Sequence, residues 1–373
     1  MKILSIVTSF TVGGAEVLVS NLSNEFVRCG HHSVVAALSP AHAIGNRPET
    51  EAEMQSRIEN RGGRTVQLGL INRKNFLVGA RTMRRLLKDE QPDIVHAHTA
   101  RAVPMLGLAG MQVPLVLTHH NSRLPFPPSL FRFLDLFVDT YVAISAQCGK
   151  LISAASRKPI VHIANGTGPE FLATSGRARI NRPAALLAVG ALTEQKNYKL
   201  MIEAAVKVRK ARPDFPFVLS IAGDGKLRGE ASGAIEALEA QEYIKLLGDR
   251  SDVSSLMQKA DLFLNSSHYE GLPVAMIEAL QSALPVVATK VAGTVELVRE
   301  GENGFLVPPN DAEAFAAALH LALDCSPSTY SALSNNALKE GRKYLIGNCA
   351  SQHLDMYRRL TSETGRPSGV CAA

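Results

Sequence analysis

The chain has no tryptophan, only 5% aromatic residues and five cysteines among its 373 residues. The cysteine count is odd and no two cysteines form a C-x-x-C pair; they are Cys29, Cys148, Cys325, Cys349 and Cys371. This pattern supplies neither the ligands of a structural zinc site nor the framework of a disulfide-rich secreted domain. It therefore favours a reducing compartment such as the cytoplasm.

Long apolar runs are also missing. No stretch reaches the ~18 consecutive apolar residues that a membrane-spanning helix needs. The first eight residues have one positive charge and a short apolar stretch, whereas a signal peptide has a longer apolar region and a small-residue cleavage site. They predict a buried first strand over Ile3–Thr8.

Two cofactor motifs are absent. The sequence has no D-x-D motif, which would bridge a metal ion to a diphosphate, so we expect neither a metal nor another cofactor. It also has no G-x-G-x-x-G fingerprint, and this disfavours a Rossmann oxidoreductase.

The net charge of +6 lies entirely in the N-terminal half. Residues 1–170 contain 18 Lys and Arg against 12 Asp and Glu, whereas residues 171–373 contain 22 of each. The excess favours an anionic partner on that half, either a membrane surface or a phosphate-bearing acceptor. Ordinary solubility explains the same excess equally well.

Strand-like and helix-like segments alternate along almost the whole chain, which predicts parallel sheets covered by helices. The expected strands form two series. The first is Ile3–Thr8, Ser33–Leu38, Thr65–Leu68, Ile94–His96, Leu115–Thr118, Thr140–Ile144 and Ile160–Ile163; the second is Ala185–Val189, Phe217–Ala222, Tyr243–Leu246, Leu262–Asn265, Pro285–Ala288 and Phe305–Val307.

Between the two series, residues 165–169 through 181–183 are rich in Gly, Pro and polar residues, as in an interdomain linker. We therefore expect an α/β protein of two Rossmann-like domains, residues 1–168 and 169–347, whose parallel sheets face each other across a ligand-binding cleft.

The strongest local feature spans His268 to Leu280. A predicted strand ends just before it, a turn forms at Gly271-Leu272-Pro273, and a helix begins near Val274. Backbone N–H groups at a helix N-terminus bind phosphate well. Glu270 and Glu278 lie on either side of this turn, which suits a sugar–diphosphate–ribose ligand. Acidic residues are also common near helix N-termini without any ligand, because they interact favourably with the helix dipole.

This segment resembles the E-x7-E signature of retaining GT-B glycosyltransferases, family 4. Further stretches match the family in order and spacing: Leu247–Val253, Ala260–Ser267, Gly293–Val298 and Gly304–Val307. The resemblance implies a GT-B fold, with Glu278 on the nucleotide ribose and Glu270 near the donor sugar. It also implies that the backbone of Gly271, Leu272 and Pro273 lies against the diphosphate.

A loop with Gly190 and Lys196 follows the first strand of the second series. Lys196 can place a fixed positive charge on a diphosphate as negative charge builds up on the leaving group, and the resemblance implies this role. A solvated loop lysine is the plain alternative. The family usually has an arginine where this chain has Ala191.

Other donor contacts are implied by the resemblance alone. The loop of Gly13 and Gly14 is similar to the family's N-terminal Gly-Gly loop, which closes over the donor phosphate. Gly223 and Asp224 belong to a Gly-x-Gly loop close to the nucleotide, and Arg250 lies in the matching stretch after it.

Histidines cluster in pairs at strand ends, His96 with His98 and His119 with His120. No carboxylate or cysteine accompanies them at metal-ligand spacing. The family's T-x-H pattern fits Thr118-His119-His120 and identifies His120 as the catalytic-site histidine near the donor sugar. His98 and His119 are then expected on the acceptor side, although a hydrogen-bonded structural role is at least as common for a single histidine.

Two stretches of the N-terminal half together supply a basic and an apolar surface, the first through its positive charges and the second through its aromatic and apolar residues. One runs from Arg73 and Lys74 through Arg81, Arg84, Arg85 and Lys88, and the other from Pro125 and Phe126 through Phe131, Phe133 and Phe137. A basic and apolar face binds anionic bilayers. A solvated helix whose other side faces the core is the competing interpretation.

The resemblance covers about residues 1–360. It implies a metal-independent glycosyltransferase that retains anomeric configuration and uses a saccharide or lipid-linked acceptor. We expect the enzyme to act in bacterial cell-envelope polysaccharide or lipopolysaccharide biosynthesis, in the cytoplasm at the inner face of the plasma membrane. We expect no nucleic-acid partner. A helix over residues 348–362 is expected to return to the first domain, with a flexible tail over 363–373.

Two alternatives stay open at this point. A nucleotide-sugar epimerase of GT-B-like fold would need no acceptor. A non-catalytic nucleotide-sugar-binding protein would bind the donor without turnover. Ala191 favours this second alternative, because the family's usual phosphate-binding arginine is missing there.

Overall fold

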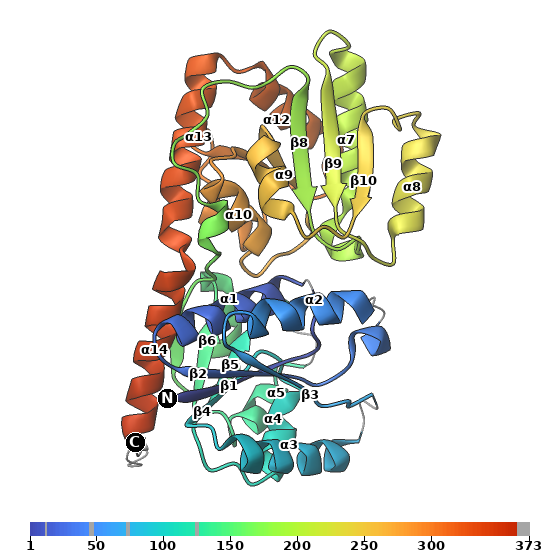
Figure 1. The fold of residues 1–373 in the computed structure, drawn as a ribbon. Helices are drawn as coiled ribbons and strands as arrows, with labels where there is room; N and C mark the ends of the chain where they lie inside the picture. Colours follow the sequence, from blue (N-terminus) through green and yellow to red (C-terminus); the bar gives the residue numbers. More distant parts are fainter. Residues whose placement is uncertain (12, 45–47, 72–74, 124–126, 364–373) are drawn as a thin grey trace. The chain divides into compact units, whose positions relative to one another are not determined.

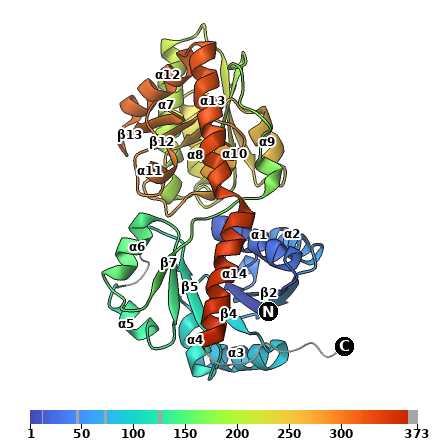
Figure 2. The ribbon, with the colours of Figure 1, turned by 90° about the vertical axis from the view of Figure 1, so that its left-hand side faces the viewer.

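The structure is a computed structural model that describes residues 1–11, 13–44, 48–71, 75–123 and 127–363. It divides into two compact units. The N-terminal unit comprises Met1–Gly166 together with the segment from Ile346 onward, and the C-terminal unit comprises Thr167–Leu345. Each is a parallel sheet with helices on both faces (Figures 1 and 2). The α/β architecture predicted from the alternation of segments is confirmed.

The N-terminal unit is built on a seven-stranded parallel sheet in the order β3-β2-β1-β4-β5-β6-β7. Its opening strand is buried along nearly its full length in the middle of the sheet, as its apolar run predicts. The strands are β1 (Lys2–Val7), β2 (His32–Ala37), β3 (Arg64–Gln67), β4 (Ile94–Ala97), β5 (Leu115–His119), β6 (Thr140–Ala143) and β7 (Ile160–His162).

The strand order reverses direction between β1 and β4, and this decides where the helices lie. Right-handed crossovers place helices on one face for strands added on one side of β1 and on the opposite face for strands added on the other side. Figure 1 shows α1 and α2 on one face and α3, α4 and α5 on the other. The helices are α1 (Gly14–Arg28), α2 (Pro48–Glu59), α3 (Phe76–Glu90), α4 (Ala102–Leu108), α5 (Leu130–Leu134) and α6 (Ala146–Ser153).

The C-terminal unit repeats this plan with six parallel strands in the order β10-β9-β8-β11-β12-β13. The order reverses between β8 and β11. The strands are β8 (Ala184–Val189), β9 (Phe217–Ala222), β10 (Ile244–Gly248), β11 (Leu262–Asn265), β12 (Val286–Thr289) and β13 (Gly304–Val307). The helices are α7 (Tyr198–Ala211), α8 (Arg228–Ala237), α9 (Val253–Lys259), α10 (Val274–Gln281), α11 (Thr294–Leu297), α12 (Ala312–Asp324) and α13 (Pro327–Gly341).

Most of the segment expected as a linker is part of the C-terminal unit. The Arg177 guanidinium donates hydrogen bonds to the carbonyls of Met257, Gln258 and Ser282, at 2.9 to 3.2 Å. The Asp261 carboxylate accepts from the backbone and side chain of Asn181. The polar residues that gave this segment its linker-like composition are thus the ones that attach it to its own unit.

The last helix, α14 (Ile346–Glu363), packs on the N-terminal unit. Its buried residues Ile346, Leu354 and Tyr357 share a hydrophobic cluster with Leu22 and Phe26 of α1. The flexible tail expected over 363–373 lies, from residue 364 on, outside the described residues. None of the helices in the described ranges combines the length and apolar character needed to cross a membrane.

Candidate functional site

The carboxyl ends of β8 and β11 meet where the strand order of the C-terminal sheet reverses. Two polar loops leave the sheet at this point, one after each strand. The Lys196 ammonium from the first loop lies 2.6 Å from Oε1 of Glu270 in the second. Such a reversal is where ligands bind in parallel α/β sheets. Topology therefore brings together two residues that the motifs suggested separately.

The Glu270 carboxylate is only 5% exposed and accepts hydrogen bonds from several neighbours. Besides Lys196, the Ser267 hydroxyl donates to Oε1 at 2.6 Å, and the Asn265 amide donates to the same oxygen at 3.5 Å. The Gln195 amide donates to Oε2 at 3.4 Å. All these partners are donors, and together they hold the carboxylate in one orientation against Lys196.

Helix α10 begins directly after this loop, with Pro273 as its N-cap residue. Met276 and Ile277 both donate their N–H groups to Pro273 O. The first N–H groups of a helix have no acceptor within the helix and attract anions. Glu278, 6% exposed, lies on the same helix. Helix α10 thus begins at Val274, as the sequence predicts, while the ribose contact of Glu278 stays a prediction.

The turn lies close to the loop before α11. A Cβ atom on Gly293 would lie 2.4 Å from Gly271 O, which is too close for any side chain. Gly293 is therefore required for the close approach of this backbone to Gly271.

The loops after β8 and β9 are also joined through their backbones. Gly190 and Gly223 adopt φ values of 151° and 138°, which only glycine tolerates well. A Cβ atom on Gly223 would lie 2.2 Å from Gly190 O. Leu192 N donates to Asp224 O at 3.0 Å. Gly190, Gly223 and Asp224 therefore form one continuous wall beside Lys196.

Arg250, predicted among the donor contacts, has a carboxylate partner of its own. Its Nε and Nη2 donate to the two oxygens of Asp252 at 2.7 and 2.6 Å. The pair lies at the surface, after β10. Ala191, where the family's arginine is expected, is exposed. Lys196 is thus the cation that the structure places at Glu270.

In the N-terminal unit, His98 and His120 lie at the carboxyl ends of neighbouring strands. His98 Nδ1 is 3.0 Å from His120 Nε2, so one nitrogen donates and the other accepts. The two rings are stacked at 5.2 Å. The structure thus brings together two histidines that were predicted for different roles, whereas the His119 ring bonds to the carbonyl of Arg123.

Burial is the main influence on the protonation of these histidines. Burial, together with a smaller effect of neighbouring histidines, lowers the pKa of His120 to about 3 and that of His98 well below its ordinary value. Both rings are therefore neutral at pH 7. A neutral ring offers one donor and one acceptor nitrogen, which suits a sugar hydroxyl.

The predicted Gly-Gly loop precedes α1. Gly13 is the N-cap residue and Gly14 begins the helix, and both are exposed. The position fits an anion-binding helix start. Val12 of this loop lies outside the described residues.

Sequence reasoning missed the residues that support the site. Three of them, Gln195, Asn265 and Ser267, are polar residues next to motif residues and close to strand ends. That position could have indicated them as partners of the site. Tyr357 had no such signal: its hydroxyl lies 2.5 Å from His96 Nδ1, although the two residues are 261 positions apart. In the ranges the structure describes, no group of three or more His, Cys, Asp and Glu side chains is arranged to hold a metal ion.

Each half of the chain matches a family of known proteins. Residues 12–171 match the family Glycosyltransferase Family 4, and residues 176–340 match Glycosyl transferases group 1. The lipopolysaccharide core biosynthesis glycosyltransferase LpsE of Rhizobium meliloti is 26% identical over 285 residues, which cover 74% of this chain and 78% of LpsE.

A second relative, from Campylobacter jejuni, is 24% identical over 95% of this chain and 98% of its own length. It is named GalNAc-alpha-(1->4)-GalNAc-alpha-(1->3)-diNAcBac-PP-undecaprenol alpha-1,4-N-acetyl-D-galactosaminyltransferase. Among solved structures, Anabaena Alr3699/HepE in complex with UDP and glucose has a TM-score of 0.78 at 20% identity, over 96% of this chain and all of that one. The predicted GT-B architecture is confirmed.

Proposed function

We propose that this protein, a glycosyltransferase with one domain of each of these two families, transfers a sugar from a nucleotide-sugar donor to a saccharide or lipid-linked acceptor with retention of anomeric configuration. The observation that carries the proposal is the Lys196 ammonium held 2.6 Å from Glu270, in the loop that leads into α10. A fixed cation next to a helix N-terminus is suited to a diphosphate leaving group.

The donor is assigned to the C-terminal unit. Lys196 and the turn at Gly271–Pro273 bind the diphosphate, and Glu278 accepts hydrogen bonds from the ribose hydroxyls. The wall formed by Gly190, Gly223 and Asp224 lies along the nucleotide. Two further donor contacts are proposed, one from Arg250 and one from the loop of Gly13 and Gly14. His98, His119 and His120 of the N-terminal unit are proposed to contact the reacting sugars, with His120 at the donor sugar.

Catalysis in this proposal comes from positioning and charge stabilisation, because no protein side chain attacks the sugar. The bond between the sugar and the diphosphate breaks, and Lys196 and the helix N-terminus stabilise the negative charge that develops on the leaving phosphate. That phosphate takes the proton of the acceptor hydroxyl on the same face of the sugar, where the new glycosidic bond forms. The chain needs no metal for these steps.

The names of the relatives support an envelope role. One acts in lipopolysaccharide core biosynthesis and another on an undecaprenol-linked saccharide. We therefore place this protein in bacterial envelope polysaccharide or lipopolysaccharide biosynthesis, in the cytoplasm at the inner face of the plasma membrane.

Ligand-dependent thermal unfolding of the purified chain is the first test, with uridine, guanosine and adenosine diphosphates and their sugar conjugates. A ligand that binds only the folded chain raises the melting temperature, and at a given concentration a tighter ligand raises it more. We expect one nucleotide series to stabilise the wild type and to stabilise K196M much less. The proposal is wrong if no member stabilises the chain, or if K196M responds like the wild type.

The second test identifies the reaction. The stabilising donor is incubated alone and with envelope glycolipid extract, and the anomeric configuration of the product is determined by NMR. We expect sugar transfer only with the extract, and retention in the product. An altered donor sugar without acceptor would instead identify an epimerase, and binding without turnover would identify a non-catalytic protein.

A further inference from the structure

Exposed apolar side chains are concentrated on one face of the N-terminal unit. Nine large hydrophobic residues are exposed in the described part of the chain, and seven of them lie between Ile71 and Leu136. Single exposed apolar residues are common on any protein, but a concentration of them marks an interaction site. The most exposed are Leu136 at 71%, Leu77 at 68% and Ile71 at 65%, followed by Leu108, Val78, Phe133 and Phe76.

Packing joins the elements that carry these residues into one surface, called the α3–α5 face below. Helix α3 approaches α4 so closely that a Cβ on Gly79 would lie 2.6 Å from Met105 Sδ. A Cβ on Gly107 would likewise meet the Phe137 ring, whose centroid is 5.6 Å from that of Phe133. Figure 1 shows α3, α4 and α5 together on the side of the sheet away from α1 and α2.

The same face is positively charged. Helix α3 buries Gly79, Ala80, Met83, Leu86 and Glu90, and its exposed side carries Arg81, Arg84, Arg85 and Lys88. Asp89 is the one acidic residue on that exposed side. Glu90 does not offset the charge, because it is buried and paired with Lys2 and Arg64 at 2.9 and 3.0 Å. Within the described residues, no carboxylate forms an ion pair with the four cations.

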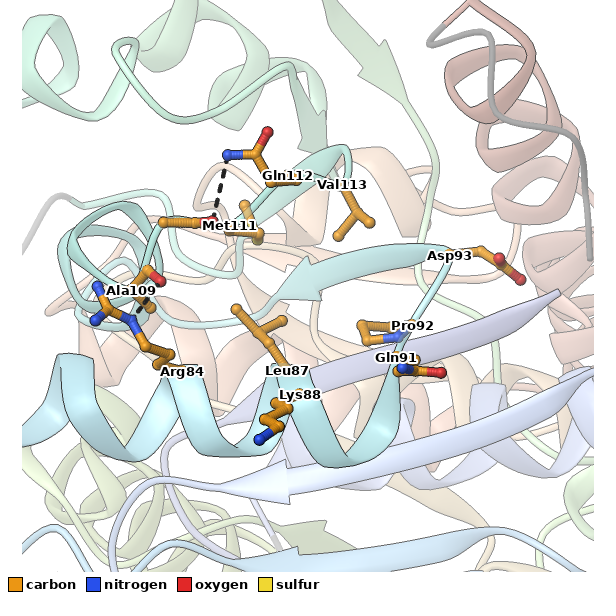
Figure 3. Close-up of a pocket in the computed structure, with 11 residues that line it drawn as sticks. Arg84, Leu87, Lys88, Gln91, Pro92, Asp93, Ala109, Met111, Gln112 and Val113 are labelled. Atoms are coloured by element: carbon orange, nitrogen blue, oxygen red, sulfur yellow. Dashed lines mark hydrogen bonds between the residues drawn. The ribbon is translucent and has the colours of Figure 1, made fainter.

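A groove of about 430 Å³ runs between the C-terminal half of α3 and the loop after α4. Leu87, Met111 and Val113 line it with apolar groups, and Arg84 reaches across one end of it to donate to Ala109 O at 3.1 Å (Figure 3). The groove therefore has an apolar lining beside a guanidinium group that the backbone holds in place.

We propose that the α3–α5 face docks on an anionic lipid bilayer. Its cations lie at the lipid phosphates, and Leu77, Leu108 and Leu136 enter the interfacial region. A basic face with separate apolar side chains fits a charged bilayer, which combines electrostatic attraction with burial of apolar area. A second copy of the chain fits less well, because a two-fold contact would bring the same positive face against itself.

Docking needs neither donor nor acceptor, so its test is separate from that of glycosyl transfer. The full chain is sedimented with vesicles of phosphatidylcholine alone or mixed with phosphatidylglycerol. We expect binding to the anionic vesicles only, and weaker binding as salt is raised. The variants R81Q/R85Q/K88Q and L77S/L136S should each bind at least about tenfold more weakly, since each cation and each buried apolar group contributes to binding.

Control variants on the C-terminal unit remove exposed positive charges or an exposed leucine. K210Q/K259Q/K339Q removes the same amount of charge, and L321S removes a leucine that is 60% exposed. Both should bind anionic vesicles like the wild type, and unfolding curves check that every variant is folded. Equal binding by face variants and controls overturns the proposal. So does the absence of vesicle binding, or a dimer in solution that the face variants dissociate.

Discussion

Lys196 Nζ lies 2.6 Å from Glu270 Oε1, although 74 positions separate the two residues in the chain. The pair is largely buried: the side chains of Lys196 and Glu270 are 20% and 6% exposed. Removing one partner of a buried ion pair leaves a charge without compensation, so it affects stability as well as function. Each substitution at this pair therefore needs both an activity and an unfolding measurement.

Replacing Lys196 with methionine should lower kcat/KM for the donor about 10²- to 10³-fold. The reason is loss of the charge that stabilises the leaving diphosphate, an effect of the size seen when one transition-state hydrogen-bond donor is removed. Steady-state kinetics measure it. The double variant K196M/E270Q is the control, because it also removes the negative charge left behind at Glu270. It should unfold at a higher temperature than K196M yet stay as inactive. Recovery of activity in the double variant would contradict the role of Lys196.

Replacing Glu278 with alanine should raise the KM of the donor strongly, about tenfold or more, because a carboxylate that accepts from the ribose hydroxyls is lost. A donor with 2′-deoxyribose makes the test specific. The wild type should bind this donor more weakly than the normal one, whereas E278A should bind the two alike. A wild type that does not distinguish the two donors would rule out the ribose contact, as would an E278A enzyme with unchanged KM and kcat.

Gly223→Ala should destabilise the C-terminal unit by about 2 kcal/mol or more, because the new Cβ would meet Gly190 O and the left-handed backbone strains any other residue. Gly229→Ala is the matched control, since nothing lies within 4 Å of its Cβ position at the start of α8. It should be neutral or stabilising by about 0.5 kcal/mol. Urea unfolding measures both, and equal effects of the two substitutions would be inconsistent with a required close approach at Gly223.

The histidines whose pKa is lowered by folding predict a loss of stability in acid. His120 has its pKa lowered to about 3 in the folded chain, whereas an unfolded histidine takes up a proton near its ordinary pKa of 6.5. Between these values the unfolded chain binds more protons, so the free energy of unfolding falls as the pH falls below about 6.5. Each such histidine lowers the free energy of unfolding by at most about 1.4 kcal/mol for each pH unit of acidification.

Urea unfolding at a series of pH values between neutrality and mild acid measures this slope. H120N is the comparison, because asparagine keeps a side chain able to hydrogen-bond with His98 but does not titrate in this range. The slope of H120N should be smaller than that of the wild type. Identical slopes would show that folding does not lower the pKa of His120.

Placing arginine at position 191 should lower the donor KM. Position 191 is exposed, so a larger side chain fits there. It directly follows Gly190, where an added Cβ atom would lie 3.0 Å from Lys196 Cε. A second cation next to Lys196 adds attraction for the diphosphate. A191Q is the control for side-chain size without charge, and an equal response of A191R and A191Q would mean that charge at this position does not act on the donor.

The sequence alone indicated the helices and strands of this protein and its α/β architecture. Apolar runs such as Ile3–Thr8 and Leu262–Asn265 identify buried strands because a strand covered on both faces needs apolar residues at nearly every position. The sequence also predicted the turn from Glu270 to Pro273 and the loop around Lys196, because local backbone chemistry and residue spacing define both. These signals lie within a few residues of each other along the chain.

The tertiary structure decided which residues that are far apart in the sequence come into contact. It attached the linker-like segment to the C-terminal unit through Arg177, gave Glu270 its partners from two loops, and connected His96 to Tyr357 of the last helix. It also showed which side of α3 is exposed and which helices extend that face. Composition and periodicity carry no information about these contacts, because the strand order that creates them depends on how all the helices and strands pack together.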